Sequence, residues 1–185
     1  MSEPATDADR AVVAVQLGRP PRGTRGVAYR CPCGLPAVVE TAPRLADGTP
    51  FPTLYYLTCP RAVAACSRLE SSGLMRQMNA RLAEDPELAA QYQAAHQDYL
   101  ARREALDEVP EIAGVSAGGM PGRVKCLHAL LAHALAVGPG VNPFGDEVRE
   151  LIGEWWAEGR CVEVTPEGAP ESPAPDPTGG DATSG

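Results

Sequence analysis

The chain has 185 residues, of which 44% are hydrophobic and 22% are charged, which suffices for one ordinary globular domain and is short for two. Its 19 glycines and 19 prolines exceed average usage and argue against long uninterrupted helices or extensive sheet. The formal net charge of −8 argues against a protein built as a general nucleic-acid binder.

Both ends of the chain are expected to lie outside a single folded domain of residues 10–164. Residues 1–9 are polar and acidic, which predicts a flexible N-terminus and is unlike a secretory signal. Residues 165–185 contain five prolines, four glycines and no apolar side chain larger than alanine, so they are predicted to be disordered. The longest stretch without Asp, Glu, Lys or Arg, residues 126–145, offers a helix of about 12 residues, whereas a membrane span needs about 20. We therefore expect a cytoplasmic protein with reduced thiols.

The predicted elements are mostly short helices. Residues 10–17 predict an apolar helix that Gly18 ends, and residues 19–23 predict an extended linker. Residues 37–41 and 53–58 are rich in β-branched and aromatic side chains and predict an antiparallel hairpin with a long loop. Apolar residues at helical spacing, bounded by proline and glycine, predict further helices at residues 61–72, 74–82, 85–106, 123–137 and 143–158.

The expected fold class is therefore α+β and mostly helical, with a small antiparallel β-hairpin packed against about five helices. The last predicted helix carries an apolar stripe that continues to Trp155 and Trp156, so at least one of these side chains is expected in the core. His96 and His133 are expected to pack or to form hydrogen bonds.

The cysteines provide the main candidate site. Cys31 and Cys33 are one residue apart in a turn with proline and glycine, a pattern typical of half of a metal site. The other half must come from distant residues, and the candidates are Cys59 at the end of the second strand and Cys126 with His128. Four thiolates would hold a zinc ion or an iron–sulfur cluster, and His128 could replace one of them. The alternative is buried packing thiols or reactive thiols, because free cysteine is among the most buried residue types.

Basic residues suggest two further binding surfaces. Lys125, the only lysine, and Arg123 lie near the predicted start of a helix, where free backbone N–H groups favour an anion; chance placement is the alternative. Residues 10–39 contain five arginines and no acid. This excess is either a solvated face or a docking surface for an acidic protein partner or a phosphate-bearing ligand, formed by Arg19, Arg22, Arg25 and Arg30. Nucleic acid is a weaker alternative, and no membrane partner is expected.

Several long strings carry a family resemblance. They read RCPCG at residue 30, DGTPFPTLYYLTCP at residue 47, SRLE at residue 67, RVKCLHAL at residue 123 and GVNPFGD at residue 140. Together they resemble the uncharacterised actinobacterial family known as domain of unknown function 501, over roughly residues 15–155. The resemblance identifies relatives and supplies no mechanism.

Two functions remain open at this point. The first is a metal-binding interaction or regulatory domain whose ion ties the hairpin to the helix after Gly122. The second is a small thiol-dependent enzyme acting on an anionic or phosphate-bearing substrate, with Cys126 or Cys59 as nucleophile and His128 as base. In the second case Lys125 or Arg123 would hold the substrate. Against it, the sequence shows no acid at a recognisable spacing to orient His128.

Overall fold

The structure is a computed structural model that describes residues 2–163. Within these residues the elements, in chain order, are β1 (Glu3–Pro4), α1 (Asp7–Leu17), β2 (Thr24–Arg30), β3 (Pro36–Thr41), β4 (Tyr55–Leu57), α2 (Pro60–Ser71), α3 (Leu74–Glu84), α4 (Pro86–Glu104), the 3₁₀ helix η1 (Pro110–Ile112), α5 (Leu127–Val137) and α6 (Pro143–Ile152). The α+β, mostly helical fold class is confirmed. The tail predicted at residues 165–185 lies outside the described residues.

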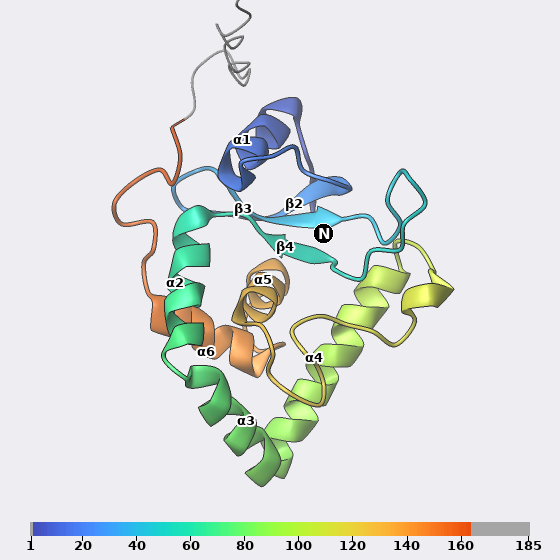
Figure 1. Cartoon of the computed structure of the whole chain (residues 1–185), viewed down its shortest axis with the longest axis vertical. Coiled ribbons are helices and arrows are strands. Elements are labelled where there is room, and N and C mark those ends of the chain that lie inside the picture. The colour runs from blue at the N-terminus through green and yellow to red at the C-terminus, as the bar shows by residue number, and fades with distance from the viewer. Residues whose placement is uncertain (1, 164–185) are drawn as a thin grey trace, which may run out of the picture.

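The strands form one antiparallel sheet in the order β1-β2-β3-β4. The predicted hairpin corresponds to β3 and β4, which pair Val38 with Leu57 and Glu40 with Tyr55. The strand β2 was not predicted, because its arginines and Gly26 are not typical of strands. This segment forms a strand by pairing with β3. In Figure 1, α1 lies on one side of the sheet, and α5 lies on the other.

The N-terminal residues join this sheet. Glu3 and Pro4 pair with Val27 and Gly26 of β2, and α1 begins at Asp7 rather than at the predicted Arg10. The reason is a capping box at Thr6, whose hydroxyl accepts the Asp9 N–H while the Asp9 carboxylate accepts the Thr6 N–H.

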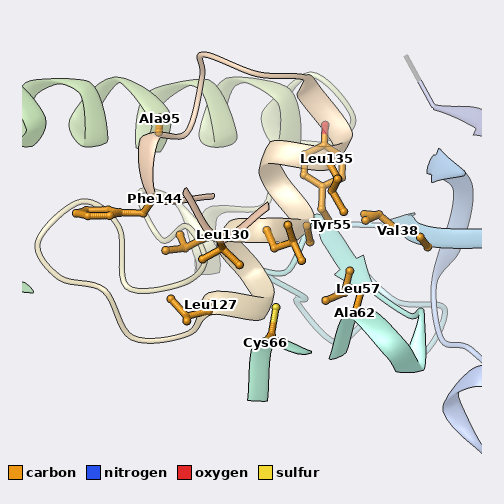
Figure 2. Packing of buried hydrophobic residues seen from close by; sticks show 14 of the residues in the cluster. Val38, Tyr55, Leu57, Ala62, Cys66, Ala95, Leu127, Leu130, Leu135 and Phe144 are labelled. Atoms are coloured by element: carbon orange, nitrogen blue, oxygen red, sulfur yellow. The ribbon is translucent and has the colours of Figure 1, made fainter. Parts of the chain in front are cut away.

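The helix α5 forms the centre of the core. Its sequence is apolar on all sides, which is typical of a helix buried on every face, and Leu127, Leu130, Leu131 and His133 have no exposed surface. Figure 2 shows Leu127, Leu130 and Leu135 of this helix among side chains from the sheet, α2, α4 and α6. None of the helices in residues 2–163 combines the length and the apolar content that crossing a membrane requires.

The predicted start of α5 is wrong by one turn. The helix begins at Leu127 instead of Arg123, because the N–H groups of Arg123, Lys125 and Cys126 donate to the carbonyls of Gly118 and Gly119. Both glycines have positive φ angles, 69° and 95°, which form a turn that other residues rarely adopt. This loop bonding keeps residues 123–126 outside the helix and leaves Cys126 at the N-cap position with extended backbone.

The predicted end of the last helix is also wrong. The helix α6 stops at Ile152, because Gly153 has φ 59° and ψ −144°, a conformation open to glycine. The two tryptophans therefore follow the helix instead of extending its stripe. Trp155 is nevertheless buried, as expected of at least one of them, and packs edge to face on Trp156 with ring centroids 4.5 Å apart.

Candidate functional site

The candidate site lies where the N-terminal end of α5 meets one face of α2. Val63, Ser67 and Glu70 follow one another at spacings of four and three residues, which places them on the same side of α2. Cys126 and His128 lie on either side of Leu127, the first residue of α5. Among the described residues, the ligand atoms of Glu70, Cys126 and His128 form the one group of three possible metal ligands within 4.8 Å of one another.

The imidazole of His128 is held at both ring nitrogens. Its Nδ1 lies 3.1 Å from Oε1 of Glu70 and 3.9 Å from Sγ of Cys126. Its Nε2 lies 3.2 Å from the carbonyl oxygen of Val63 and 3.3 Å from Oγ of Ser67. A carbonyl oxygen only accepts hydrogen bonds, so Nε2 carries a proton and donates it to Val63.

Glu70 is anchored at the start of α5. Its Oε1 accepts the N–H of Leu127 at 2.7 Å, which satisfies one of the donors that a helix N-terminus leaves free. The positive end of the helix dipole favours the carboxylate charge at this place. The helix N-terminus predicted to bind an external anion is therefore bonded to a carboxylate of the chain itself.

The contacts among Glu70, Cys126 and His128 shift the pKa values of the thiol and of the imidazole. The contact with His128 lowers the pKa of the Cys126 thiol, although burial opposes this change. The contact with Cys126, together with Glu70, raises the pKa of His128 to about 9. Near neutral pH and without an ion, His128 therefore holds a second proton on Nδ1, between the sulfur and the carboxylate.

A cavity of about 550 Å³ opens beside these groups. Cys126, His128 and Ala129 line it at one side, and the rest of its wall is mostly apolar. The wall includes residues from the end of α1, from β4 and from the first turns of α2, namely Leu17, Tyr55, Tyr56, Leu57, Pro60, Val63 and Ala64. The thiol and the imidazole are thus accessible from a pocket that suits an apolar ligand with a polar end.

The other predicted ligands lie elsewhere. Cys31 and Cys33 are in the turn between β2 and β3, and Cys59 is the N-cap of α2. Cys31 and Cys59 are buried in the core, whereas Cys33 is half-buried. The structure brings these three thiols close to Cys161, a residue that sequence reasoning left out, and it groups Cys126 with Glu70 and His128 instead.

The predicted anion-binding side chains are exposed. Arg123 and Lys125 lie in the extended segment before α5. The backbone N–H groups of both residues are bonded to the turn at Gly118 and Gly119, so the geometry that motivated this prediction is absent from residues 123–125.

The arginine-rich segment is largely paired within the chain. Arg22 pairs with Asp47 at 2.6 Å, and Arg25 lies 3.8 Å from Glu40. Arg30 pairs with Asp9 at 2.9 Å and with Glu3 at 3.2 Å. Arg19 lines a second cavity of about 400 Å³ together with Arg22. The docking surface for an acidic or phosphate-bearing partner stays a prediction, and these ion pairs reduce the charge it can offer.

The two remaining histidines form hydrogen bonds, as predicted. His96 Nδ1 lies 2.8 Å from Oγ of Ser116. His133 is fully buried, with Nε2 3.0 Å from the Asp98 carboxylate and Nδ1 3.2 Å from the Asn142 amide. Both have structural partners that explain their presence.

Comparison with known families gives a match over residues 27–150 to the family described as "Protein of unknown function (DUF501)". The chain belongs to the DUF501 family. The match confirms the resemblance that the sequence strings carry, and it spans Glu70, Cys126 and His128. It also spans the three cysteines around β3, whereas Cys161 follows the matched residues. Neither a curated protein nor a solved structure matches the chain.

Glu70 is the functional residue that sequence reasoning missed. It supplies the acid whose absence argued against a role for His128, but it lies 58 residues earlier in the chain. The string SRLE was noted for its family resemblance only. Helical spacing would have placed Glu70 on the same face of α2 as Val63 and Ser67, yet nothing in the sequence says that this face meets α5.

Proposed function

We propose that this DUF501 domain binds one zinc ion through Sγ of Cys126, Nδ1 of His128 and the carboxylate of Glu70. Zinc accepts sulfur, nitrogen and oxygen ligands in this combination and favours tetrahedral geometry. Ligand atoms around a tetrahedral zinc ion lie about 3.4–3.6 Å apart, given the usual bond lengths. The separations of 3.1 and 3.9 Å from His128 Nδ1 lie close to this range.

The observation that carries the proposal is that Cys126 and Glu70 both lie beside the same ring nitrogen of His128. Nδ1 of His128 faces the thiol and the carboxylate together, while Nε2 donates to the Val63 carbonyl. A backbone carbonyl bound to the far nitrogen is the usual support for a metal-ligating histidine, because it fixes the tautomer and the ring orientation. In the proposed complex the ion replaces the proton on Nδ1, so binding releases protons.

Three protein ligands leave one tetrahedral position for a fourth group. Sites with three protein ligands are typically those that exchange water for a substrate or effector, whereas structural zinc sites have four. Cys126 and His128 line the 550 Å³ cavity, so an incoming ligand would approach from there. The function proposed is therefore a zinc-dependent binding or regulatory domain whose ligand has a metal-binding donor and an apolar body.

A second candidate function is the thiol-dependent enzyme. The observation in its favour is the lowered pKa of Cys126 beside a protonated His128, the pairing that activates cysteine nucleophiles. In such enzymes, however, the orienting acid usually holds the ring nitrogen opposite the nucleophile. Here Glu70 and Cys126 share Nδ1, which favours the metal interpretation.

The test measures zinc content and zinc affinity of the full chain. Cys126→Ser and Glu70→Gln are each expected to lose one equivalent of zinc, and the affinity should fall by more than the roughly 10–100-fold typical of supporting residues. Cys66→Ala is the matched control, because this buried thiol lies one turn before Glu70 on α2 and outside the ligand set.

Two outcomes would contradict the proposal. The first is an unchanged zinc content in Cys126→Ser. The second is rapid alkylation of Cys126 near neutral pH in zinc-saturated protein, slowed by His128→Asn, which would favour the thiol-dependent enzyme.

A further inference from the structure

Four cysteines from three separate parts of the chain lie near the turn that joins β2 to β3. Cys31 and Cys33 flank Pro32 in the turn from β2 to β3, Cys59 begins α2, and Cys161 lies in the segment after α6. All four are free thiols. Each belongs to the main hydrophobic core cluster or packs against it.

Backbone hydrogen bonds position the chain at Cys31 and at Cys59. The N–H of Cys31 donates to the Leu35 carbonyl at 2.8 Å, and the Gly34 N–H donates to the Cys31 carbonyl at 2.8 Å, which closes a tight turn. The N–H of Cys59 lies 3.5 Å from the Ala37 carbonyl, so α2 begins beside the first residues of β3. A turn of this kind lets backbone and thiols surround a small ion.

Two side chains bond the segment around Cys161. Nε2 of Gln16 lies 3.4 Å from Sγ of Cys161 and 2.8 Å from the Pro36 carbonyl, which links α1, β3 and the C-terminal segment. The guanidinium of Arg61 donates to the carbonyls of Gly159 at 3.1 Å and Glu158 at 3.3 Å. Figure 1 shows this segment running from α6 past α2 towards α1 and the sheet.

The thiols lie near one another. Cys33 is close enough to Cys31 and to Cys161 for these neighbours to affect the pKa of its thiol, and Cys59 affects the pKa of Cys161 in the same way. Cys59 also affects the pKa of Cys31. Within residues 2–163 no three of these sulfurs all lie within 4.8 Å of one another, so an ion would have to draw them together.

We propose that Cys31, Cys33, Cys59 and Cys161 bind a second, structural zinc ion. Four thiolates are the usual ligand set of a closed structural site. Cys31 and Cys59 are buried and fixed, whereas Cys33 and Cys161 are half-buried in irregular segments, where small shifts can draw their sulfurs onto an ion. Cys161 takes the place that the sequence suggested for Cys126.

The ion would fasten the C-terminal segment to the rest of the domain. Residues 158–161 of this segment are otherwise held by Gln16 and by Arg61, whose guanidinium is exposed. A four-thiolate site has no open position for substrate, so its role is to join segments distant in sequence. This proposal is independent of the Cys126 site, because the two ligand sets share no residue.

The test counts metal in variants of the full chain purified without oxygen. Wild type is expected to hold two zinc equivalents, and Cys161→Ser and Cys126→Ser should each lose one, with additive loss in the double variant. Replacement of zinc by Co²⁺ should produce a thiolate-to-cobalt absorption band that Cys161→Ser reduces much more than Cys126→Ser. Cys161→Ser should also be cut faster by protease after Ile152.

A measurement on wild type covers the case in which Cys161→Ser fails to fold. A thiol-specific mercurial reagent should release this ion as four thiols react, and peptide mapping should identify those thiols as Cys31, Cys33, Cys59 and Cys161. The proposal is overturned if Cys161→Ser keeps its full zinc content. Iron with a brown colour, or a disulfide at Cys161 without zinc, would overturn it equally.

Discussion

The two cysteine sites differ in ligand chemistry, in exposure and in the way the fold builds them. The Cys126 site combines sulfur, nitrogen and oxygen from the facing ends of two helices and lies beside a cavity. The four-thiol site contains sulfur atoms alone. They come from a turn, from the N-cap of α2 and from the segment after α6. The proposed Cys126 site has three candidate ligands at close range, and the proposed four-thiol site has four that lie further apart.

This difference separates two uses of a metal ion. At the proposed Cys126 site, three ligands at the facing ends of α2 and α5 would leave one position for exchange, and the nearby cavity would admit a ligand. At the proposed four-thiol site no position would be free, so the binding energy of the ion would stabilise the fold. Ligand number and access, rather than the presence of cysteine, therefore suggest which site acts on other molecules and which one holds the chain together.

The largest expected contrast is in stability. In zinc-loaded protein, Cys59→Ser should lower the free energy of unfolding by more than about 4 kcal/mol, because it removes a buried ligand of the structural ion. Cys126→Ser should cost less than about 2 kcal/mol, because its sulfur is half-buried at a helix end. Urea unfolding measures both values. Cys66→Ser is the control, because it also places a hydroxyl at a buried position. An equal loss of unfolding free energy in Cys59→Ser and Cys66→Ser would contradict the role of Cys59 as a ligand of the structural ion.

A change in the packing between α5 and α6 should weaken zinc binding at the proposed Cys126 site and leave the four-thiol site unchanged. A Cβ atom at Gly145 would lie 2.3 Å from the Leu130 carbonyl oxygen and 2.7 Å from Cβ of Ala134, so Gly145→Ala must push α6 away from α5. We expect a loss of about 1–3 kcal/mol in unfolding free energy. Isothermal titration should show weaker zinc binding at the Cys126 site, while the cobalt–thiolate band of the other site is unchanged.

Gly122→Ala is the matched control for this substitution, because no atom lies within 4 Å of the added Cβ. Equal weakening of zinc binding in both alanine variants would contradict the proposed coupling of the Cys126 site to the α5 packing.

The buried His133 of α5 gives a test of the fold through pH. Burial lowers the pKa of His133 even though the Asp98 carboxylate opposes this, so the unfolded chain takes up a proton at higher pH than the folded one. The contribution of His133 to the stability of metal-free protein should be complete above about pH 6.5 and should fall as pH decreases below it, by at most about 1.4 kcal/mol per pH unit for one proton.

Thermal unfolding between pH 5 and pH 7.5 tests this dependence. His133→Gln should flatten it, and so should His96→Gln, because burial also lowers the pKa of His96. An unchanged slope in both variants would show that other groups control the acid response.

The smallest effect is expected from the hydroxyl behind His128. Ser67 Oγ lies 3.3 Å from Nε2, but the Val63 carbonyl also holds this nitrogen at 3.2 Å. Ser67→Ala should therefore weaken zinc binding about tenfold at most, at the low end for supporting residues, and cost about 1 kcal/mol in stability. Ser71→Ala, one turn further along α2, is the control and should change neither value. A hundredfold loss would mean that Ser67 rather than Val63 orients the ring.

The sequence alone determined the local features of this protein. The hairpin of β3 and β4, the helix boundaries at Pro60, Pro86 and Pro143, and the buried character of α5 follow from residue type and spacing, because these act over a few neighbouring residues. The family followed in the same way from strings of consecutive residues. The thiols at Cys31, Cys33 and Cys59 were singled out for their chemistry before any arrangement was known.

Only the tertiary structure decided which residues share a site. The loop bonds to Gly118 and Gly119 delay α5 until Leu127, which turns Cys126 and His128 towards α2 and Glu70. Gly153 ends α6 early and directs the chain back to the sheet, which brings Cys161 rather than Cys126 to the other three thiols. Both outcomes depend on contacts between segments about 60 or more residues apart, and local propensity carries no information about such contacts.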